Sequence, residues 1–275
     1  MSFGILLRNE TIKASRFLPF RVTTIAFAVL MGTNFAQGHL NSIKTGRQPW
    51  AFPGAWNEIL GEPVQISLFF LSVLIILLVA NEFTWRTARQ NVIDGLSKEE
   101  WFTAKVIVLP IVVAIFFTVI VGLGTLFASL GNDPAPTGPM LPAADAKIMG
   151  AALLSQLGYA SLALLIATSI RGAGSAIGVF FLYAAFVERL IGALLTQVGE
   201  TVGSMAKFLP TATFNGVIQR VQWDPAAFER AVQAATRNNR PAPELIDSTL
   251  LIAVATAWIL TFLAVAFFSF RKRDL

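Results

Sequence analysis

Long apolar blocks recur six times along this chain, and they constrain its fold more than any other feature. They fall at residues 18–37, 63–81, 104–130, 148–170, 173–197 and 249–270. Each approaches the roughly 20 residues that a helix needs to cross a hydrocarbon layer about 30 Å thick. Backbone groups in lipid must bond within the segment, and the blocks lack the alternation of barrel strands. The sequence therefore predicts an all-α integral membrane protein with six transmembrane helices.

The composition excludes several other classes of protein. Of the 275 residues, 55% are hydrophobic and only 13% are charged, whereas a soluble domain carries about 25% charged residues. The net charge is +5, but no basic face with aromatic or polar base readers is visible, so we expect no nucleic-acid partner. Because the chain has no cysteine, it has no disulfide framework, thiolate metal site or cysteine nucleophile.

The distribution of Lys and Arg indicates the orientation in the membrane. Six spans place both termini on one side, and basic residues beside short loops are retained in the cytoplasm. Cytoplasmic termini place most of these residues inside, namely Arg8, Lys13, Arg16, Arg21, Arg86, Arg89, Lys98, Lys105, Arg171, Arg271, Lys272 and Arg273. The two short outer connections then hold only Lys44, Arg47 and Lys147. We expect a multi-pass protein of the cell (inner) membrane with both termini cytoplasmic, although basic residues in 198–248 weaken the bias.

Residues 1–17 mix apolar and basic positions in the manner of a short helix that lies in the headgroup plane. The apolar positions include Phe3 and Leu7, and the basic ones are Arg8, Lys13 and Arg16. We expect an interfacial helix here; the alternative is a frayed tail.

The polar segment between the second and third blocks reads NEFTWRTARQNVIDGLSKEEWFTAK, residues 81–105. No Gly or Pro interrupts 81–94, so the second span is expected to continue unbroken as a helix to Asp94. Glu82 and Arg86 stand four residues apart and are expected to form an ion pair. Gly95, which follows Asp94, permits the left-handed turn that ends helices.

A second helix is expected to begin directly after this turn. Ser97 and Glu100 have the spacing of a capping box, which marks a helix N-terminus. Trp101 and Phe102 would then lie at the membrane interface, where aromatic rings are favoured. The pattern predicts a rigid projection, because a flexible linker would be rich in Gly and Ser.

Segment 81–105 as a whole resembles the cytoplasmic loop between the second and third spans of ABC exporter permeases of the ABC-2 type. The resemblance rests on Glu82, Thr87, Gly95-Leu96-Ser97-Lys98, Glu99, Trp101-Phe102 and Lys105. Many members carry Pro before the Ser and Arg after it; this chain has Leu96 and Lys98, which keep the turn and the charge. Outside 81–105 the chain agrees in the number, order and length of its spans, and Phe208-Leu209-Pro210 also resembles a family feature.

The resemblance implies one permease domain over 1–275, forming half of the translocation path of an ATP-driven exporter. A coupling segment, 82–103, would dock on a separate ABC ATPase subunit, and the residues implied are Glu82, Arg86, Thr87, Arg89, Asp94, Gly95, Ser97, Lys98 and Glu99. A second permease, identical or paralogous, and the lipid bilayer complete the expected partners. The chain lacks the G-x-x-x-x-G-K-[ST] motif, so we expect ATP and Mg on the partner ATPase, and no catalytic residue, cofactor or metal on this chain. The alternative for the segment is a solvated connector.

Residues 198–248 are expected to form an outer region that is partly re-entrant and partly helical. TVGSMAKFL, bounded by Pro210, is apolar enough to dip back into the membrane, and Asp224-Pro225 has the signature of a helix start. A packing role and a role in substrate release both stay open.

Glu188 and Arg189 interrupt the fifth apolar block. An ionisable residue inside a span is expensive and is usually functional or paired. Glu188 lies roughly 24 Å along the helix from its cytoplasmic start, which is near the outer boundary. An outer gate and an anchoring pair are both consistent with this position.

The rival classes are a secondary transporter, or another polytopic protein not driven by ATP, and an intramembrane enzyme. Scattered aspartates and a lone histidine, His39, give no clustered catalytic or metal-ligating motif, and His39 is expected to be a plain surface residue. Gly174 and Gly178 have the spacing of close helix packing, as do the small residues of the fourth block.

Overall fold

The computed structural model describes residues 12–13, 16–45, 52–130, 139–240 and 242–272, and all regular structure within these ranges is helical. In chain order the elements are α2 (Leu18–Thr45), α3 (Trp56–Ile59), α4 (Glu62–Thr84), α5 (Thr87–Ile93), α6 (Lys98–Ser129), α7 (Ala143–Ile170), α8 (Ala173–Leu182), the π-helical turn η1 (Tyr183–Val187), α9 (Glu188–Val198), α10 (Glu200–Gly203), the 3₁₀ turn η2 (Ser204–Phe208), α11 (Pro210–Val217), the 3₁₀ turn η3 (Arg220–Gln222), α12 (Pro225–Arg237) and α13 (Ser248–Lys272).

Six helical stretches are long and apolar enough to cross a membrane, namely Leu18–Lys44, Trp56–Thr84, Lys98–Ser129, Ala143–Ile170, Ala173–Val198 and Ser248–Lys272. The prediction of an all-helical chain with six apolar spans is thereby confirmed. The first four helical stretches each extend at one end or both beyond the predicted apolar blocks. Of the predicted interfacial helix at 1–17, only residues 12–13 and 16–17 are among those described, so most of that prediction lies outside them.

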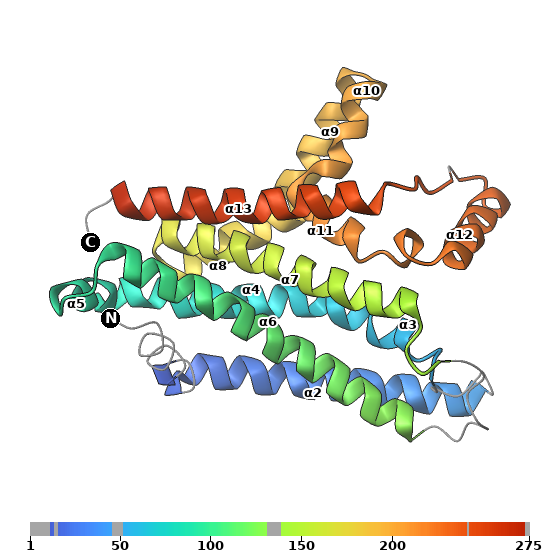
Figure 1. Ribbon diagram of the computed structural model, residues 1–275, viewed down its shortest axis with the longest axis horizontal. Helices are drawn as coiled ribbons and strands as arrows, with labels where there is room; N and C mark the ends of the chain where they lie inside the picture. The colour runs from blue at the N-terminus through green and yellow to red at the C-terminus, as the bar shows by residue number, and fades with distance from the viewer. Residues whose placement is uncertain (1–11, 14–15, 46–51, 131–138, 241, 273–275) are drawn as a thin grey trace.

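The long helices lie side by side as a bundle (Figure 1), with α7 packed against both α4 and α13, and α2 packed against α6. α4 and α7 are the most deeply buried spans. The start of α2, all of α5 and the end of α13 lie at one end of this bundle, while α3 and α12 lie at the other (Figure 1). α5 therefore lies at the same end of the bundle as the start of α2 and the end of α13.

The fifth span does not stay in the bundle along its whole length. α8 follows the other helices, but α9 and α10 project away from them (Figure 1). The chain then returns through α11, which packs against α7 and α13. Downstream, the Asp224 carboxylate accepts the Ala226 N–H at 3.0 Å and caps α12, so the predicted helix start is confirmed.

Small residues of α7 allow the returning segment to approach closely. A Cβ on Gly158 would lie 2.3 Å from the ring of Phe214, a buried residue of α11. The expectation of close packing on the fourth span is therefore met at this contact. Gly174 and Gly178 of α8, in contrast, have no described atom within 4 Å of such a Cβ.

The contact between α7 and α11 predicts the effect of a single methyl group. Gly158→Ala should destabilise the protein by about 1–3 kcal/mol, because the enclosed Phe214 ring has no space to move into. Gly150→Ala on the same helix meets no atom of the described residues within 4 Å and should be neutral or slightly stabilising. The thermal unfolding midpoints of the two variants in one detergent provide the measurement. Equal midpoints would contradict the predicted packing.

Candidate functional site

The second span ends earlier than the sequence predicts. α4 stops at Thr84, and Arg86 adopts a left-handed conformation with φ 57 before α5 begins at Thr87. The prediction of an unbroken helix to Asp94 is therefore wrong. The turn is held by the Thr87 hydroxyl, which donates to the carbonyl of Glu82 at 3.2 Å, and by the burial of Ala88 against the bundle. Neither contact has a Gly or Pro signal in the sequence.

The second turn of the segment follows the predicted chemistry closely. Gly95 has φ 100, its N–H donates to the Val92 carbonyl at 3.1 Å, and the Leu96 N–H donates to the Asn91 carbonyl at 3.0 Å. These two bonds define a Schellman motif, which satisfies the last carbonyls of α5. Two residues later, α6 begins, so α5 and α6 are joined by a short, fully bonded turn.

The start of α6 carries the predicted capping box. The Ser97 hydroxyl accepts the Glu100 N–H at 3.1 Å, and the Glu100 carboxylate accepts the Ser97 N–H at 3.0 Å. Reciprocal bonds of this kind fix the first turn of a helix. The predicted turn at Gly95 and the predicted capping box of α6 are both confirmed.

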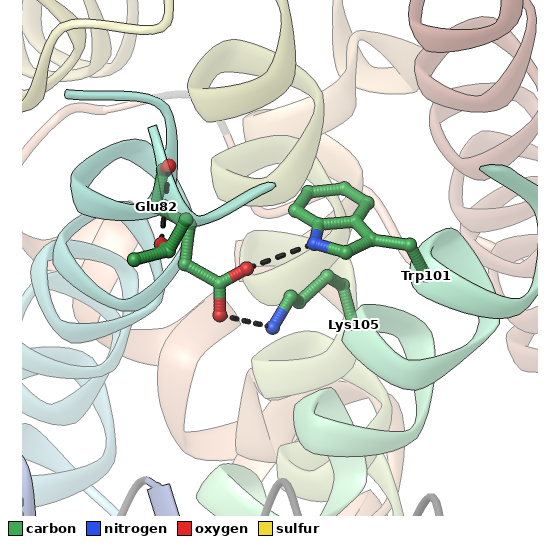
Figure 2. A network of polar contacts seen from close by, with 4 residues as sticks. Glu82, Trp101 and Lys105 are labelled. Atoms are coloured by element: carbon green, nitrogen blue, oxygen red, sulfur yellow. Dashed lines mark hydrogen bonds and ion pairs between the residues drawn. The ribbon is translucent and has the colours of Figure 1, made fainter. Parts of the chain in front are cut away.

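Glu82 joins the end of α4 to α6, as Figure 2 shows. Its carboxylate accepts a hydrogen bond from the Trp101 indole Nε1 at 2.8 Å and forms an ion pair with the Lys105 Nζ at 2.5 Å. The Lys105 side chain is only 3% exposed and that of Glu82 14%. The expected pairing of Glu82 with Arg86 is wrong, because the break at Arg86 ends the helix and the carboxylate faces α6 instead.

Trp101 connects this pair to the last span. Its ring is 1% exposed and stacks on Phe270 of α13, with centroids 4.6 Å apart. Phe102 is also buried and contacts Phe267 and Phe270. α13 covers both rings, and the expected place of Trp101 and Phe102 at the membrane interface stays a prediction.

Polar contacts beside these rings also reach the end of α13. The Lys98 ammonium donates to the Arg271 carbonyl at 3.4 Å, and Arg271 forms an ion pair with Glu99 at 3.6 Å. We call the set Glu82, Trp101, Lys105 and Phe270 the buried knot; it fastens the ends of three spans to one another.

The solvent-exposed surface of segment 82–103 lies on α5 and on the residues that flank it. The side chains of Arg86, Thr87, Arg89, Asp94 and Ser97 are exposed, as are Gly95 and Glu99, whereas Lys98 is partly exposed. Asp94 accepts a hydrogen bond from Gln90 at 2.9 Å. Two large apolar side chains, Trp85 and Ile93, are 60% and 66% exposed, and sequence reasoning did not select them. The available sequence signal is the occurrence of large apolar residues within the otherwise polar stretch 81–105.

A cavity of about 340 Å³ lies beside α5, and its lining is Phe83, Arg86, Ala88, Arg89 and Arg171. We call it the arginine cavity. Arg171, between α7 and α8, has φ 60, and its guanidinium lies over the Phe83 ring, 5.1 Å from the centroid. No local sequence pattern connects Arg171 with segment 82–103, because 82 residue positions separate it from Arg89.

A second cavity, of about 520 Å³, is lined in part by Glu82. Its apolar lining comes from α4, α6, Trp85 and the N-terminal residues Ile12 and Phe17, and its polar lining includes Lys13, Arg16, Gln90 and Lys105. The described part of the N-terminal segment therefore packs at the same end of the bundle as α5.

The two charged residues of the fifth span have different environments. Glu188 is 4% exposed, and its carboxylate accepts the N–H groups of Thr211 at 3.0 Å and Ala212 at 2.8 Å, in the first turn of α11. A carboxylate at a helix N-terminus satisfies donors that have no partner within the helix. Arg189 is exposed. The two residues are thus not an anchoring pair; Glu188 alone anchors α11 to α9.

Among the described residues, no group of three His, Cys, Asp or Glu side chains is arranged to hold a metal ion. His39 lies partly buried near the end of α2, with its ring 6.5 Å from that of Phe127.

The chain belongs to a family whose model is described as "Protein of unknown function (DUF2705)" and which matches residues 20–275. No curated protein matches the chain.

The buried knot predicts unequal effects for two neighbouring carboxylates. Glu82→Ala should cost about 3–5 kcal/mol, because it removes the carboxylate from a buried ion pair. Glu99→Ala should cost less than about 1 kcal/mol, since Glu99 and Arg271 are both more than half exposed.

The double variant Glu82→Ala/Lys105→Met separates the charge from the packing. An apolar residue in place of the lysine removes the uncompensated charge, so the double variant should be more stable than Glu82→Ala alone. Thermal unfolding midpoints measure all three variants. A double variant less stable than Glu82→Ala would contradict the ion-pair account.

Proposed function

We propose that this chain is the membrane-spanning permease subunit of an ATP-driven exporter, and that its segment 82–103 docks on a separate ATPase subunit. The observation that carries the proposal is the construction of the α4–α6 connection. α5 and its flanking residues are exposed to solvent. The two ends of the connection, at Glu82 and at Trp101, are held to α4, α6 and α13 by the buried knot. A segment held in this way transmits a displacement to the spans, whereas a flexible linker would absorb it.

The exposed surface of α5 has the composition of a protein-binding site. Trp85 and Ile93 supply apolar area, and Thr87 and Gln90 supply hydrogen-bonding groups beside them. Aromatic residues are enriched at the centres of protein interfaces, with polar groups around them. A groove on a soluble ATPase subunit is the partner for which such a surface is suited.

The remaining parts of the proposal concern the assembly. The whole chain acts as one permease domain in the cell membrane, with both termini and α5 in the cytoplasm, where ATP is available. Two six-helix units, identical or paralogous, form the translocation path between them. ATP and Mg bind to the partner ATPases, whose closure moves α5 and through it α4, α6 and α13. The region 198–248 stands on the outer side, and α11 is its re-entrant part.

The turn at Gly95 tests this mechanism. Gly95→Val should insert and fold but lose transport-coupled ATP hydrolysis, because φ 100 is strained for a branched side chain. Gly95→Asn should retain most of the coupling, because Asn tolerates the left-handed region. No atom of the described residues lies within 4 Å of a Cβ built at this position, so backbone conformation distinguishes the two variants.

The assay is ATP hydrolysis by the co-expressed ATPase, together with its co-purification on the tagged chain. A Gly174→Val control removes a glycine from an equally open site without a positive φ and should couple normally. Normal coupling by Gly95→Val would sink the proposed mechanism. Undiminished co-purification after replacement of Trp85, Thr87, Gln90 and Ile93 by Ala or Ser would refute the docking surface.

A secondary transporter is the second candidate, and one observation favours it. The π-helical turn Tyr183–Val187 interrupts the fifth span immediately before the buried carboxylate of Glu188. π-helical turns are frequent at functional sites, and interrupted helices hold the coupling ions of secondary transporters.

Glu188→Gln distinguishes the two candidates. An ion-coupled carrier should lose uphill transport when this carboxylate cannot ionise, while deletion of the ATPase gene should leave its transport intact. An ATP-driven exporter should keep substantial transport in Glu188→Gln, because the amide oxygen still accepts one of the two N–H groups of α11, and should lose transport when the ATPase is deleted. Substrate accumulation in membrane vesicles measures both.

A further inference from the structure

The second half of the fifth apolar stretch does not follow the axis of the bundle. Length and apolarity join α8, η1 and α9 in one candidate span, but α9 and α10 project sideways from the long helices (Figure 1). α8 has 10 residues and η1 has 5, and together they extend at most about 22 Å at helical rise. The hydrocarbon layer is about 30 Å thick. The chain therefore leaves the bundle before it has crossed the whole layer.

α9 has one face of large apolar side chains. They recur with the spacing of a single helical stripe, and they are Leu190, Ile191, Leu194, Leu195 and Val198. Three of them, Leu190, Leu194 and Val198, are 62%, 52% and 73% exposed. Within the part of the chain that the structure describes, the apolar stripe of α9 is therefore left largely uncovered.

The opposite face of α9 packs on the chain that returns beside it. A Cβ on Gly203 would lie 3.0 Å from the Cα of Thr196, and a Cβ on Gly192 would lie 3.6 Å from the Cβ of Ala206 in η2. α9, α10 and η2 thus form a closed hairpin, residues 188–208, which we call the lateral arm. Its small residues are used for packing within the arm.

Both ends of the lateral arm are fixed to the bundle. At its start, the buried Glu188 carboxylate accepts the N–H groups of Thr211 and Ala212 in α11. At its end, the Trp258 indole of α13 donates to the Phe208 carbonyl at 2.9 Å. These bonds hold the arm at one height along the bundle, so the apolar stripe is presented at that height.

The chemistry of the stripe favours lipid over water or a second protein as its partner. A continuous row of large apolar side chains is not left in water without a partner. Helices in membranes meet one another through small residues that let their backbones approach, but the exposed stripe carries only Leu, Ile and Val. Arg189 and Gln197 are exposed on the other side of α9. A helix with an apolar face and a polar face is suited to lie in the plane of a membrane surface.

We propose that the lateral arm lies in the plane of the membrane, in the leaflet at the α12 end of the bundle, with its apolar stripe against acyl chains. α8 and η1 then supply the fifth crossing as far as that leaflet, and the chain continues sideways instead of along the bundle. The aliphatic stem of Arg189 lets its guanidinium reach the headgroups. The placement requires neither an ATPase nor a substrate, so it stands or fails independently of the proposed transport function.

The experiment uses the full chain in phosphatidylcholine vesicles. Because the chain has no cysteine, each introduced cysteine is a unique site for a spin label. Collisions of the label with oxygen, which concentrates in lipid, and with a water-soluble nickel chelate give its depth in the membrane. Leu190→Cys and Val198→Cys lie eight positions apart on α9. Leu260→Cys and Phe268→Cys are the matched pair on α13, also eight positions apart, at residues that are 61% and 56% exposed.

The two pairs of labels should differ in depth. Eight residues of a helix that runs along the bundle axis cover about 12 Å, and the pair on α13 should show most of this difference. The pair on α9 should show less than half of the α13 difference, and both of its labels should collide with oxygen more than with the chelate. Gln197→Cys, on the polar side of α9, should collide with the chelate more often than Val198→Cys does.

Other results would overturn the placement. A depth difference on α9 equal to that on α13 would show that α9 crosses the membrane along the bundle axis. Low accessibility of both α9 labels to oxygen and to the chelate would show that a second copy or another protein covers the stripe, and a preference of both for the chelate would place it in water. Exposed positions tolerate substitution, and an unfolding midpoint equal to that of the wild type shows that a labelled variant is folded. Leu194→Cys, on the same stripe, takes the place of either α9 variant that does not fold.

Discussion

The ion pair of Glu82 with Lys105 is the interaction on which the arrangement of this end of the molecule depends. A carboxylate and an ammonium withdrawn from water are tolerated only when their geometry is good and further hydrogen bonds satisfy them. Trp101 supplies such a bond, and its ring carries the constraint on to Phe270. The cost of separating these groups in a low-dielectric region prevents α4, α6 and α13 from moving independently where they meet the polar segment.

The sequence was a good guide wherever the cause of a structure is local or is imposed by the bilayer. Six spans could be predicted because lipid demands one uninterrupted apolar stretch per crossing. The turn at Gly95 and the capping box of Ser97 could be predicted because their bonds join residues three to five positions apart. Rules of this kind need no knowledge of what packs against the segment.

Tertiary contacts decided the features that the sequence did not reveal. The break at Arg86 has no Gly or Pro signal, because burial of Ala88 and the bond of Thr87 hold it. Local spacing suggested a partner for Glu82 four residues away, but the true partners lie 19 and 23 positions along the chain. Nothing in the sequence around Trp101 indicates that its ring packs on Phe270 of α13.

Rigidity is therefore unevenly distributed along the chain, and this bears on how motion would pass through it. At the α4–α6 connection, a Schellman motif, a capping box and the buried knot act in series, so a displacement of α5 moves the attached spans as a unit. The fifth span is different: a π-helical turn precedes Glu188, and beyond it α9 leaves the bundle, held to α11 through that carboxylate. A force applied at α5 would thus pass through stiff contacts with α4, α6 and α13 and would be accommodated where the fifth span is interrupted.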